Sequence, residues 1–134
     1  MNNQFQNRPA LKSGNYKIAD LANRYDTSLR TLRYYEQSGL VRPHRPNQHT
    51  RFYSEEDVSR LDLVFDCRRT GMSVREIRDL LRQRDELADR DFSKAYARAL
   101  RKRMAQLLEE LEELERQKTF LKRDLAALDA SDAA

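Results

Sequence analysis

The amino-acid sequence predicts a mainly α-helical fold, in which a winged helix-turn-helix domain precedes a long coiled-coil dimerisation helix. Three observations lead to this prediction. Two short amphipathic segments lie close together near the N-terminus, a proline-containing stretch without helical periodicity follows them, and leucines repeat with a heptad period over the last third of the chain. We expect an N-terminal arm at 1–15, the winged helix-turn-helix at 16–82, a linker at 83–91, the coiled-coil helix at 92–129 and a tail at 130–134.

The first two helices follow from apolar spacing and turn residues. Residues 1–15 are rich in Asn, Gln and Pro and lack periodicity, which indicates a mobile arm. Beyond it, apolar residues recur at the spacing of one helix face: Ile18, Leu21, Ala22 and Tyr25. Asp26 is suited to a left-handed turn, and Thr27 or Ser28 then caps a second helix that continues to about Gln37. Gly39 is the stop signal of this second helix.

Between Leu40 and Tyr53 the helical period disappears. Pro43 and Pro46 interrupt it, and the loop-like run RPHRPNQHT separates two short apolar stretches. This pattern predicts a small β-hairpin, or wing, although no Asn-Gly turn defines its register.

Two further helices are expected after the wing. Ser54 caps the first of them, whose opening turn is acidic, as the helix dipole favours, and Gly71 ends it. Ser73 and Glu76 form a capping box that opens the next helix. The side chains predicted to face inward are Val58, Leu61, Val64, Phe65, Val74, Ile77, Leu80 and Leu81. The mostly charged residues 83–91 then indicate a linker.

The last helix carries an unbroken heptad seam. The expected dimerisation residues are Leu100, Met104, Leu107, Leu111, Leu114, Leu121 and Leu125, with Lys118 and Leu128 in the same period. A helix over 92–129 is roughly 55 Å long at about 1.5 Å per residue, too long to bury its seam on a domain of this size. We therefore expect it to pair with a second copy of the chain; the alternative is one long solvated helix.

The basic charge is concentrated in the N-terminal part. Residues 1–54 contain nine Lys and Arg against three acids, a charge of +6, whereas the whole chain carries +4. This asymmetry favours contact with a polyanion such as DNA over the alternative of an ordinary solvated surface.

The second helix of the helix-turn-helix provides the candidate recognition residues. With Leu29 and Leu32 predicted to face inward, the expected base-reading residues are Arg30, Thr31 and Tyr34. Contacts to phosphates, which position a protein without reading sequence, are expected from Lys17, Ser28, Arg33, Tyr35, Arg42, Arg45, Arg51 and Tyr53. The alternative for each of the two adjacent tyrosines on this helix is a place in the core.

Other classes of function lack support in the sequence. His44 and His49 are five residues apart, but no carboxylate or thiol lies nearby to complete a metal site, and Cys67 is expected to be a buried structural thiol. We find no phosphate-binding glycine loop and no paired nucleophile and base, so neither an enzyme nor a cofactor is expected. No apolar run is long enough to span a bilayer, and the first fifteen residues lack an apolar block, so a cytoplasmic protein is expected.

Three stretches together resemble the MerR family of transcription regulators: YKIADLANRYDTSLRTLRYYEQSGLV, TRFYSEEDVSRL and RRTGMSVREIRDLL. The similarity runs in order from Tyr16 to Leu81, and its most specific part is R-Y-Y-E-x-x-G-L, from Arg33 to Leu40. The resemblance implies a winged helix-turn-helix, a second helical pair that contacts the DNA backbone, and an antiparallel dimerisation helix.

The resemblance also implies a mechanism. A homodimer would bind two half-sites of a promoter whose elements are spaced too far apart, and would distort the DNA so that RNA polymerase can use it. Bends of this scale cost about 1–6 kcal/mol of DNA deformation energy.

The chain departs from the metal-sensing members of that family. Those members have a cysteine at the start of the dimerisation helix and more beyond it, whereas here the start is Asp91-Phe92-Ser93 and residues 129–134 contain none. On the same grounds, neither a redox cluster of cysteines nor an added C-terminal drug-binding domain is expected. The chain is most similar to short members that control branched-chain amino acid or fatty acid breakdown. An unknown small-molecule effector would have to bind the DNA-binding domain or the dimer interface.

Two other functions remain open on the sequence. One is an architectural DNA-binding protein without promoter specificity, which would bind unrelated sequences equally. The other is a protein-interaction coiled coil with a vestigial basic domain, which would not retain DNA at physiological salt.

Overall fold

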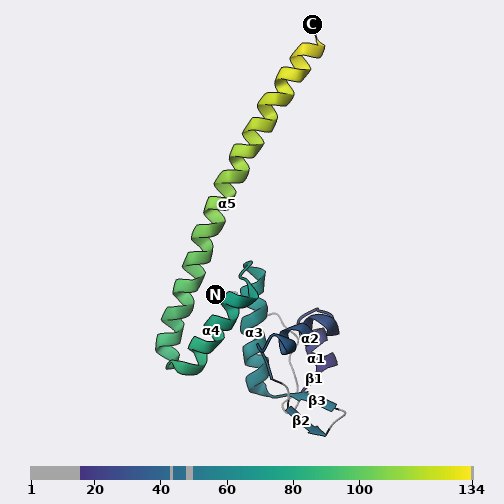
Figure 1. Cartoon of the computed structure of the whole chain (residues 1–134), viewed down its shortest axis with the longest axis vertical. Helices are drawn as coiled ribbons and strands as arrows, with labels where there is room; N and C mark the ends of the chain where they lie inside the picture. The colour runs from purple at the N-terminus through teal and green to yellow at the C-terminus, as the bar shows by residue number, and fades with distance from the viewer. Residues whose placement is uncertain (1–15, 43, 48–49, 134) are drawn as a thin grey trace. The chain divides into compact units, whose positions relative to one another are not determined.

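The structure, a computed structural model, describes residues 16–42, 44–47 and 50–133, with side chains except at 44–47, 50 and 51. The chain divides into two compact units, residues 1–92 and 93–134. Along the chain (Figure 1) the elements are β1 (Tyr16–Lys17), α1 (Ile18–Arg24), α2 (Leu29–Gln37), β2 (His44–Asn47), β3 (Thr50–Tyr53), α3 (Glu55–Arg69), α4 (Val74–Glu86) and α5 (Asp89–Asp132). The mainly helical fold class, with a helix-turn-helix, a wing and a long last helix, is therefore confirmed.

Three helices of the first unit end in the same motif. A residue with positive φ follows each last turn: Asp26 at 48°, Gly39 at 77° and Gly71 at 85°. In each case two backbone N–H groups reach back to carbonyls of the last turn, as with Gly39 to Glu36 at 3.1 Å and Leu40 to Tyr35 at 3.0 Å. A left-handed backbone conformation favours Gly and tolerates Asp, so these three residues allowed the helix ends to be predicted from the sequence.

The starts of α2, α3 and α4 also follow the sequence. The hydroxyls of Ser28, Ser54 and Ser73 each accept the backbone N–H three residues later, at 3.1 Å in all three. At the last two, the N3 carboxylate also accepts the N-cap N–H, so that both are capping boxes. These caps satisfy donors that a helix start otherwise leaves without partners.

The wing is the antiparallel pair β2 and β3, as expected (Figure 1). The third strand, β1, was not expected: Tyr16 pairs with Tyr53 and Lys17 with Phe52, which gives the order β1-β3-β2. Two residues are too few for an alternating pattern to be recognised in a sequence. Lys17 is therefore both the end of a strand and the N-cap of α1, where its N–H donates to Asp20 at 3.0 Å.

The core of the first unit draws on all of its helices and on the wing. Its fully buried side chains are Leu21, Leu32, Leu40, Val41, Tyr53, Leu61, Val64, Cys67, Met72, Ile77 and Leu81. One expected core residue differs: Leu29, at the first position of α2, is 39% exposed, whereas Leu32 one turn later is 1% exposed. The first turn of α2 therefore projects beyond the core, and the apolar face of this helix begins at Leu32.

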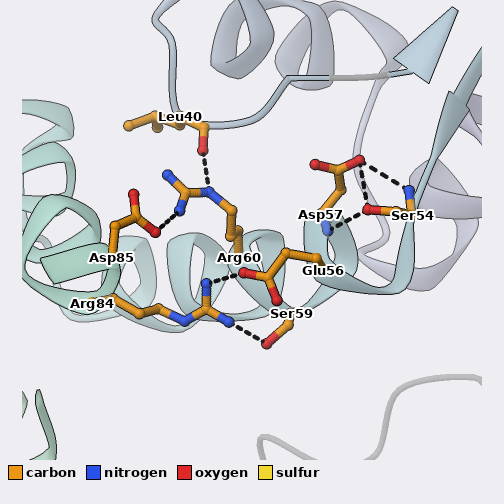
Figure 2. A network of polar contacts seen from close by, with 8 residues as sticks. All are labelled: Leu40, Ser54, Glu56, Asp57, Ser59, Arg60, Arg84 and Asp85. Carbon is orange, nitrogen blue, oxygen red and sulfur yellow. Dashed lines mark hydrogen bonds and ion pairs between the residues drawn. The ribbon is translucent and has the colours of Figure 1, made fainter. Parts of the chain in front are cut away.

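Ion pairs join α3 to α4 (Figure 2). Arg60 contacts Asp85 at 2.6 Å, and Arg84 contacts both Glu56 at 2.6 Å and the Ser59 hydroxyl at 2.9 Å. These contacts reach into the stretch that was expected to be a linker. The structure instead continues α4 to Glu86 and begins α5 at Asp89. The charged side chains of Arg84 and Asp85, which suggested a solvated loop, form ion pairs with α3.

The second unit consists of the rest of α5, which extends to Asp132, three residues beyond the helix end that was expected. The seam side chains Met104, Leu107, Leu111, Leu114, Leu121, Leu125 and Leu128 are 42–64% exposed in the single chain. Among the described residues, no helix is both long and apolar enough to cross a membrane.

Candidate DNA-binding interface

One face of α2 is open to solvent. Arg30, Arg33 and Tyr34 are exposed, with Tyr34 at 52%, and Thr31 is half-buried. The Thr31 hydroxyl lies 3.0 Å from that of Ser28, so the cap also orients this side chain. Three of the predicted contact residues therefore project from consecutive turns of one capped helix, and a fourth lies at its first turn.

The opposite face of α2 is anchored by aromatic rings. Tyr35 is 6% exposed, and its ring meets Phe65 of α3 edge-on at a centroid distance of 5.4 Å. Phe65 in turn stacks on Tyr25 at 4.3 Å. Tyr35 was predicted to contact phosphates, and this is corrected: it lies on the same side as Leu32, three residues away, and is a core residue.

Tyr53 also differs from the prediction. Its side chain is fully buried, and its hydroxyl donates to the Glu36 carboxylate at 3.2 Å. It therefore joins the end of β3 to α2 and has no surface to offer a phosphate. A tyrosine beside basic residues looks like a contact residue in a sequence, because neither its hydrogen bond to Glu36 nor the pairing of β1 with β3 can be recognised there.

A polar cluster holds α1 against α3. Arg24 donates to both carboxylate oxygens of Asp62, at 3.2 and 3.1 Å, and the Tyr25 hydroxyl donates to the same carboxylate at 2.7 Å. Burial of the Arg24 guanidinium acts to lower its pKa, but the hydrogen bond and charge of Asp62 outweigh this and raise the pKa above its ordinary value. Burial, followed by the Asp62 carboxylate, raises the pKa of Tyr25 far above its usual range.

Basic residues beyond α2 complete the candidate surface. Lys17 and Arg42 are exposed, one at the start of α1 and one on the segment that leads into the wing. The side chains of Arg45 and Arg51, which were also predicted to contact phosphates, lie outside the described residues. Of the predicted contact residues with described side chains, Lys17, Ser28, Arg30, Arg33, Tyr34 and Arg42 are thus exposed.

Two arginines that the sequence did not single out hold the segment between α2 and the wing. Arg60 of α3 donates to the Leu40 carbonyl at 3.2 Å, and Arg78 of α4 donates twice to the Ser38 carbonyl, at 3.3 and 2.9 Å. Their acceptors are main-chain atoms, so no residue type in the sequence signals these contacts. They therefore hold the main chain at the point where it leaves α2.

Among the residues that the structure describes, no group of three or more His, Cys, Asp or Glu side chains could hold a metal ion. Cys67 is fully buried in α3, as expected for a structural thiol. The side chains of His44 and His49 lie outside the described part of the chain.

Comparison with known proteins identifies the family. Residues 16–84 match the family described as MerR HTH family regulatory protein, and residues 58–123 match the family described as MerR, DNA binding. A ZntR homologue from Haemophilus influenzae, named as an HTH-type transcriptional regulator, is 41% identical over 66 residues, which is 48% of this chain and 49% of that protein. The chain thus spans about half the length of the curated relatives that it matches first.

Solved structures extend the similarity over most of the chain. The transcription regulator PbrR691 from Ralstonia metallidurans, solved with lead(II), is 34% identical with a TM-score of 0.53, over 80% of this chain and 84% of that one. HiNmlR, a MerR family regulator lacking the sensor domain and solved bound to promoter DNA, shares the fold at 24% identity and a TM-score of 0.59, over 84% and 85% of the two chains. On these matches, the chain belongs to the MerR family of helix-turn-helix regulatory proteins.

Proposed function

We propose that this protein is a sequence-specific DNA-binding transcription regulator that acts on promoter DNA as a homodimer. The observation that carries the proposal is the two-sided character of α2. Leu32 and Tyr35 are buried on one side, while Arg30, Arg33 and Tyr34 are exposed on the other. A rigidly held helix with a basic and aromatic outer face suits insertion into the major groove.

The base-reading residues proposed are Arg30, Thr31 and Tyr34. They lie in the first two turns of α2, and the N-terminal part of a recognition helix is the part that reaches base edges. Arg30 can bond guanine through two donors, and the Thr31 methyl can contact thymine. The backbone contacts proposed are Lys17, Ser28, Arg33, Arg42, Arg45 and Arg51, a set from which burial removes both Tyr35 and Tyr53.

The homodimer is proposed from the seam of α5. Seven apolar seam residues between Met104 and Leu128 are exposed in the single chain, Leu100 is half-buried, and a second copy of the same helix would cover them. The proposed dimerisation residues are Leu100, Met104, Leu107, Leu111, Leu114, Leu121 and Leu125.

Charge placement favours an antiparallel pair. In a parallel pair, the two copies of Lys118 would share one core layer, and flanking positions would set Glu110 beside Glu115 and Asp124 beside Asp129 of the other chain. Each of these contacts joins like charges. In an antiparallel pair, the layer opposite Lys118 is a leucine position instead, so the self-repulsion is relieved.

The proposed mechanism is distortion of promoter DNA so that RNA polymerase can engage its two recognition elements. A dimer holds two recognition helices at a fixed separation. The favourable free energy of their DNA contacts can then offset the cost of bending the duplex between them. Such a regulator needs no catalytic group, and we assign none. Its proposed place of action is the cytoplasm, where bacterial promoters are.

Selection of genomic fragments by the purified protein at physiological salt tests the proposal. Enrichment of a common inverted repeat near promoters is the expected result. Retention of all fragments alike would favour the architectural alternative, and no retention would contradict DNA binding altogether.

A further inference from the structure

A cleft of about 440 Å³ opens on the first unit, between the segment that follows α2 and the helices α3 and α4. Part of its wall, with Leu40, Arg60 and Asp85, is drawn in Figure 2. The volume lies within the range of pockets that take small molecules.

Guanidinium groups outnumber carboxylates around the cleft. It is lined by Arg42, Arg60, Arg78 and Arg82 but by only two acids, Asp57 and Asp85, which leaves two positive charges in excess. Both acids are already engaged. Asp57 accepts the Ser54 N–H at 2.9 Å and its hydroxyl at 3.0 Å, and Asp85 pairs with Arg60 at 2.6 Å (Figure 2).

Arg42 and Arg82 are the two lining arginines that neither a main-chain carbonyl nor a lining carboxylate holds. Within the part of the chain that the structure describes, Arg42 makes no ion pair or hydrogen bond. Arg82 pairs with Asp79 one turn earlier at 3.1 Å, but both side chains are more than half exposed. Exposed pairs of this kind contribute little stability, so an incoming anion can replace Asp79 at small cost.

The rest of the cleft is preorganised. Leu40, Val41 and Leu81, which also line it, are at most 2% exposed and give it a packed apolar base. Arg60 and Arg78 are held in place by the carbonyls of Leu40 and Ser38. Groups that are fixed before binding lose little conformational entropy when a ligand arrives.

We propose that this cleft binds a small organic dianion, a dicarboxylate or a phosphomonoester, and that the ligand lowers the affinity of the protein for DNA. The ligand charge of −2 matches the excess on the lining, and planar guanidinium groups bond carboxylate and phosphate oxygens in pairs. The second half of the proposal rests on the proposed DNA-binding function.

The link to DNA is Arg42. This residue lines the cleft and is also one of the proposed phosphate contacts, so the ligand and DNA would compete for the same guanidinium group. Its segment joins α2 to the wing and is the one whose carbonyls Arg60 and Arg78 hold. Coupling between two sites is reciprocal and commonly amounts to about 5–150-fold, so we expect the dianion to weaken DNA binding by a factor in this range.

A DNA backbone phosphate offers the same chemistry as the ligand, so the experiment separates the two sources. Amide chemical shifts of the full chain are recorded without DNA, at constant ionic strength, during titration with succinate or glycerol 3-phosphate, and with the neutral analogues succinamide and glycerol. The expected result is a saturable shift at Leu40, Arg42 and Leu81 with the two dianions alone. Arg82→Gln should abolish it, whereas Arg75→Gln, at an exposed α4 residue outside the lining, should leave it intact.

Absence of a saturable shift, or an equal shift in Arg82→Gln, overturns the proposal. Shifts at these residues that appear only with duplex DNA would assign the cleft to a backbone phosphate and also overturn it. DNA titrations of the wild type and of Arg82→Gln, each with and without succinate, complete the test. If the wild type binds succinate but no DNA, the proposed DNA-binding function is wrong while the proposed cleft ligand stands. Failure of the one proposal can therefore be distinguished from failure of the other.

Discussion

Arg24 and Asp62 form a two-point ion pair, with Nε to Oδ1 at 3.2 Å and Nη2 to Oδ2 at 3.1 Å. The pair joins the last turn of α1 to the middle of α3, across 38 residues of sequence. The Tyr25 hydroxyl adds a third donor to the same carboxylate. Asp62 therefore binds the C-terminal end of α1 through three hydrogen bonds and holds this helix against α3.

Replacement of Asp62 by Ala should destabilise the protein by about 1–3 kcal/mol, because it removes the carboxylate to which Arg24 donates twice and leaves the Tyr25 hydroxyl with the Val58 carbonyl, at 3.1 Å. The Arg24 side chain is only 15% exposed, so water replaces the lost contact poorly. Urea unfolding measures the change. The matched control is Asp79→Ala, whose pair with Arg82 is exposed on both sides and should matter by less than about 0.5 kcal/mol. Equal losses in the two variants would contradict this role for Asp62.

Stability should fall at alkaline pH because of Tyr25. Burial and the Asp62 carboxylate raise its pKa in the folded state, whereas in the unfolded chain it titrates near about 10. Above that pH the unfolded chain loses the proton while the folded chain keeps it, so the stabilisation present below about pH 10 is lost as the pH rises.

The measurement is the urea midpoint from about pH 8 to about pH 11, for wild type and Tyr25→Phe. The variant keeps the ring that stacks on Phe65 but has no proton to lose, so its midpoint should fall less steeply. Parallel curves would show that another group causes the alkaline loss.

Turns and caps were predictable from the sequence because each depends on one residue and its neighbours. Gly39 and Gly71 end helices through their own backbone conformation. Ser54 and Ser73 cap helices by accepting the backbone N–H of the residue three positions later. The heptad period of α5 was equally plain, since it repeats over many turns of a single helix.

The parts that the sequence missed depend on distant partners. The two-residue strand β1 is defined by its pairing with β3, and Tyr53 is buried with its hydroxyl bonded to Glu36, 17 residues earlier in the sequence. Tyr35 is adjacent to the exposed Tyr34, and what distinguishes the two is the contact of the Tyr35 ring with Phe65 of α3, 30 residues away in the sequence. Arg60 and Arg78 bond main-chain carbonyls, which every residue has, so no sequence pattern marks them.

The seam of α5 predicts the assembly state. Replacing Leu107 and Leu111 together by Asp should convert a dimer at micromolar concentration into a monomer, because two adjacent core layers would then bury unpaired charge. Sedimentation equilibrium decides the matter. Glu109→Ala with Glu112→Ala, at positions outside the seam of the same helix turns, is the control and should leave the dimer intact. A wild-type monomer, or an unaffected double Asp variant, would contradict the proposed interface.

Cys67 should be silent toward metals and thiol reagents. Its side chain is fully buried, so an aromatic disulfide reagent should modify it only when denaturant opens the fold. Stoichiometric zinc, copper or mercury should likewise leave operator affinity unchanged. Rapid modification of the native protein, or a metal response that Cys67→Ser removes, would show that this thiol is accessible.

Arg30 and Arg33 should differ in what they contribute to DNA binding. Arg33→Ala is expected to weaken binding to all sequences alike and to lower the slope of log affinity against log salt by about 1–2, since a dimer would lose two phosphate contacts. Arg30→Ala is expected to cost about 1–3 kcal/mol on the operator and to flatten the preference at one or two positions of each half-site.

Competition titration of the operator against a scrambled duplex at physiological salt measures whether the outer face of α2 recognises DNA sequence. For the wild type, we expect an operator affinity at least about 1,000-fold above that for the scrambled duplex. We expect this ratio to fall in Arg30→Ala and to stay nearly unchanged in Arg33→Ala. A wild-type ratio near one, or a ratio that falls with Arg33→Ala and not with Arg30→Ala, would contradict sequence recognition by this face.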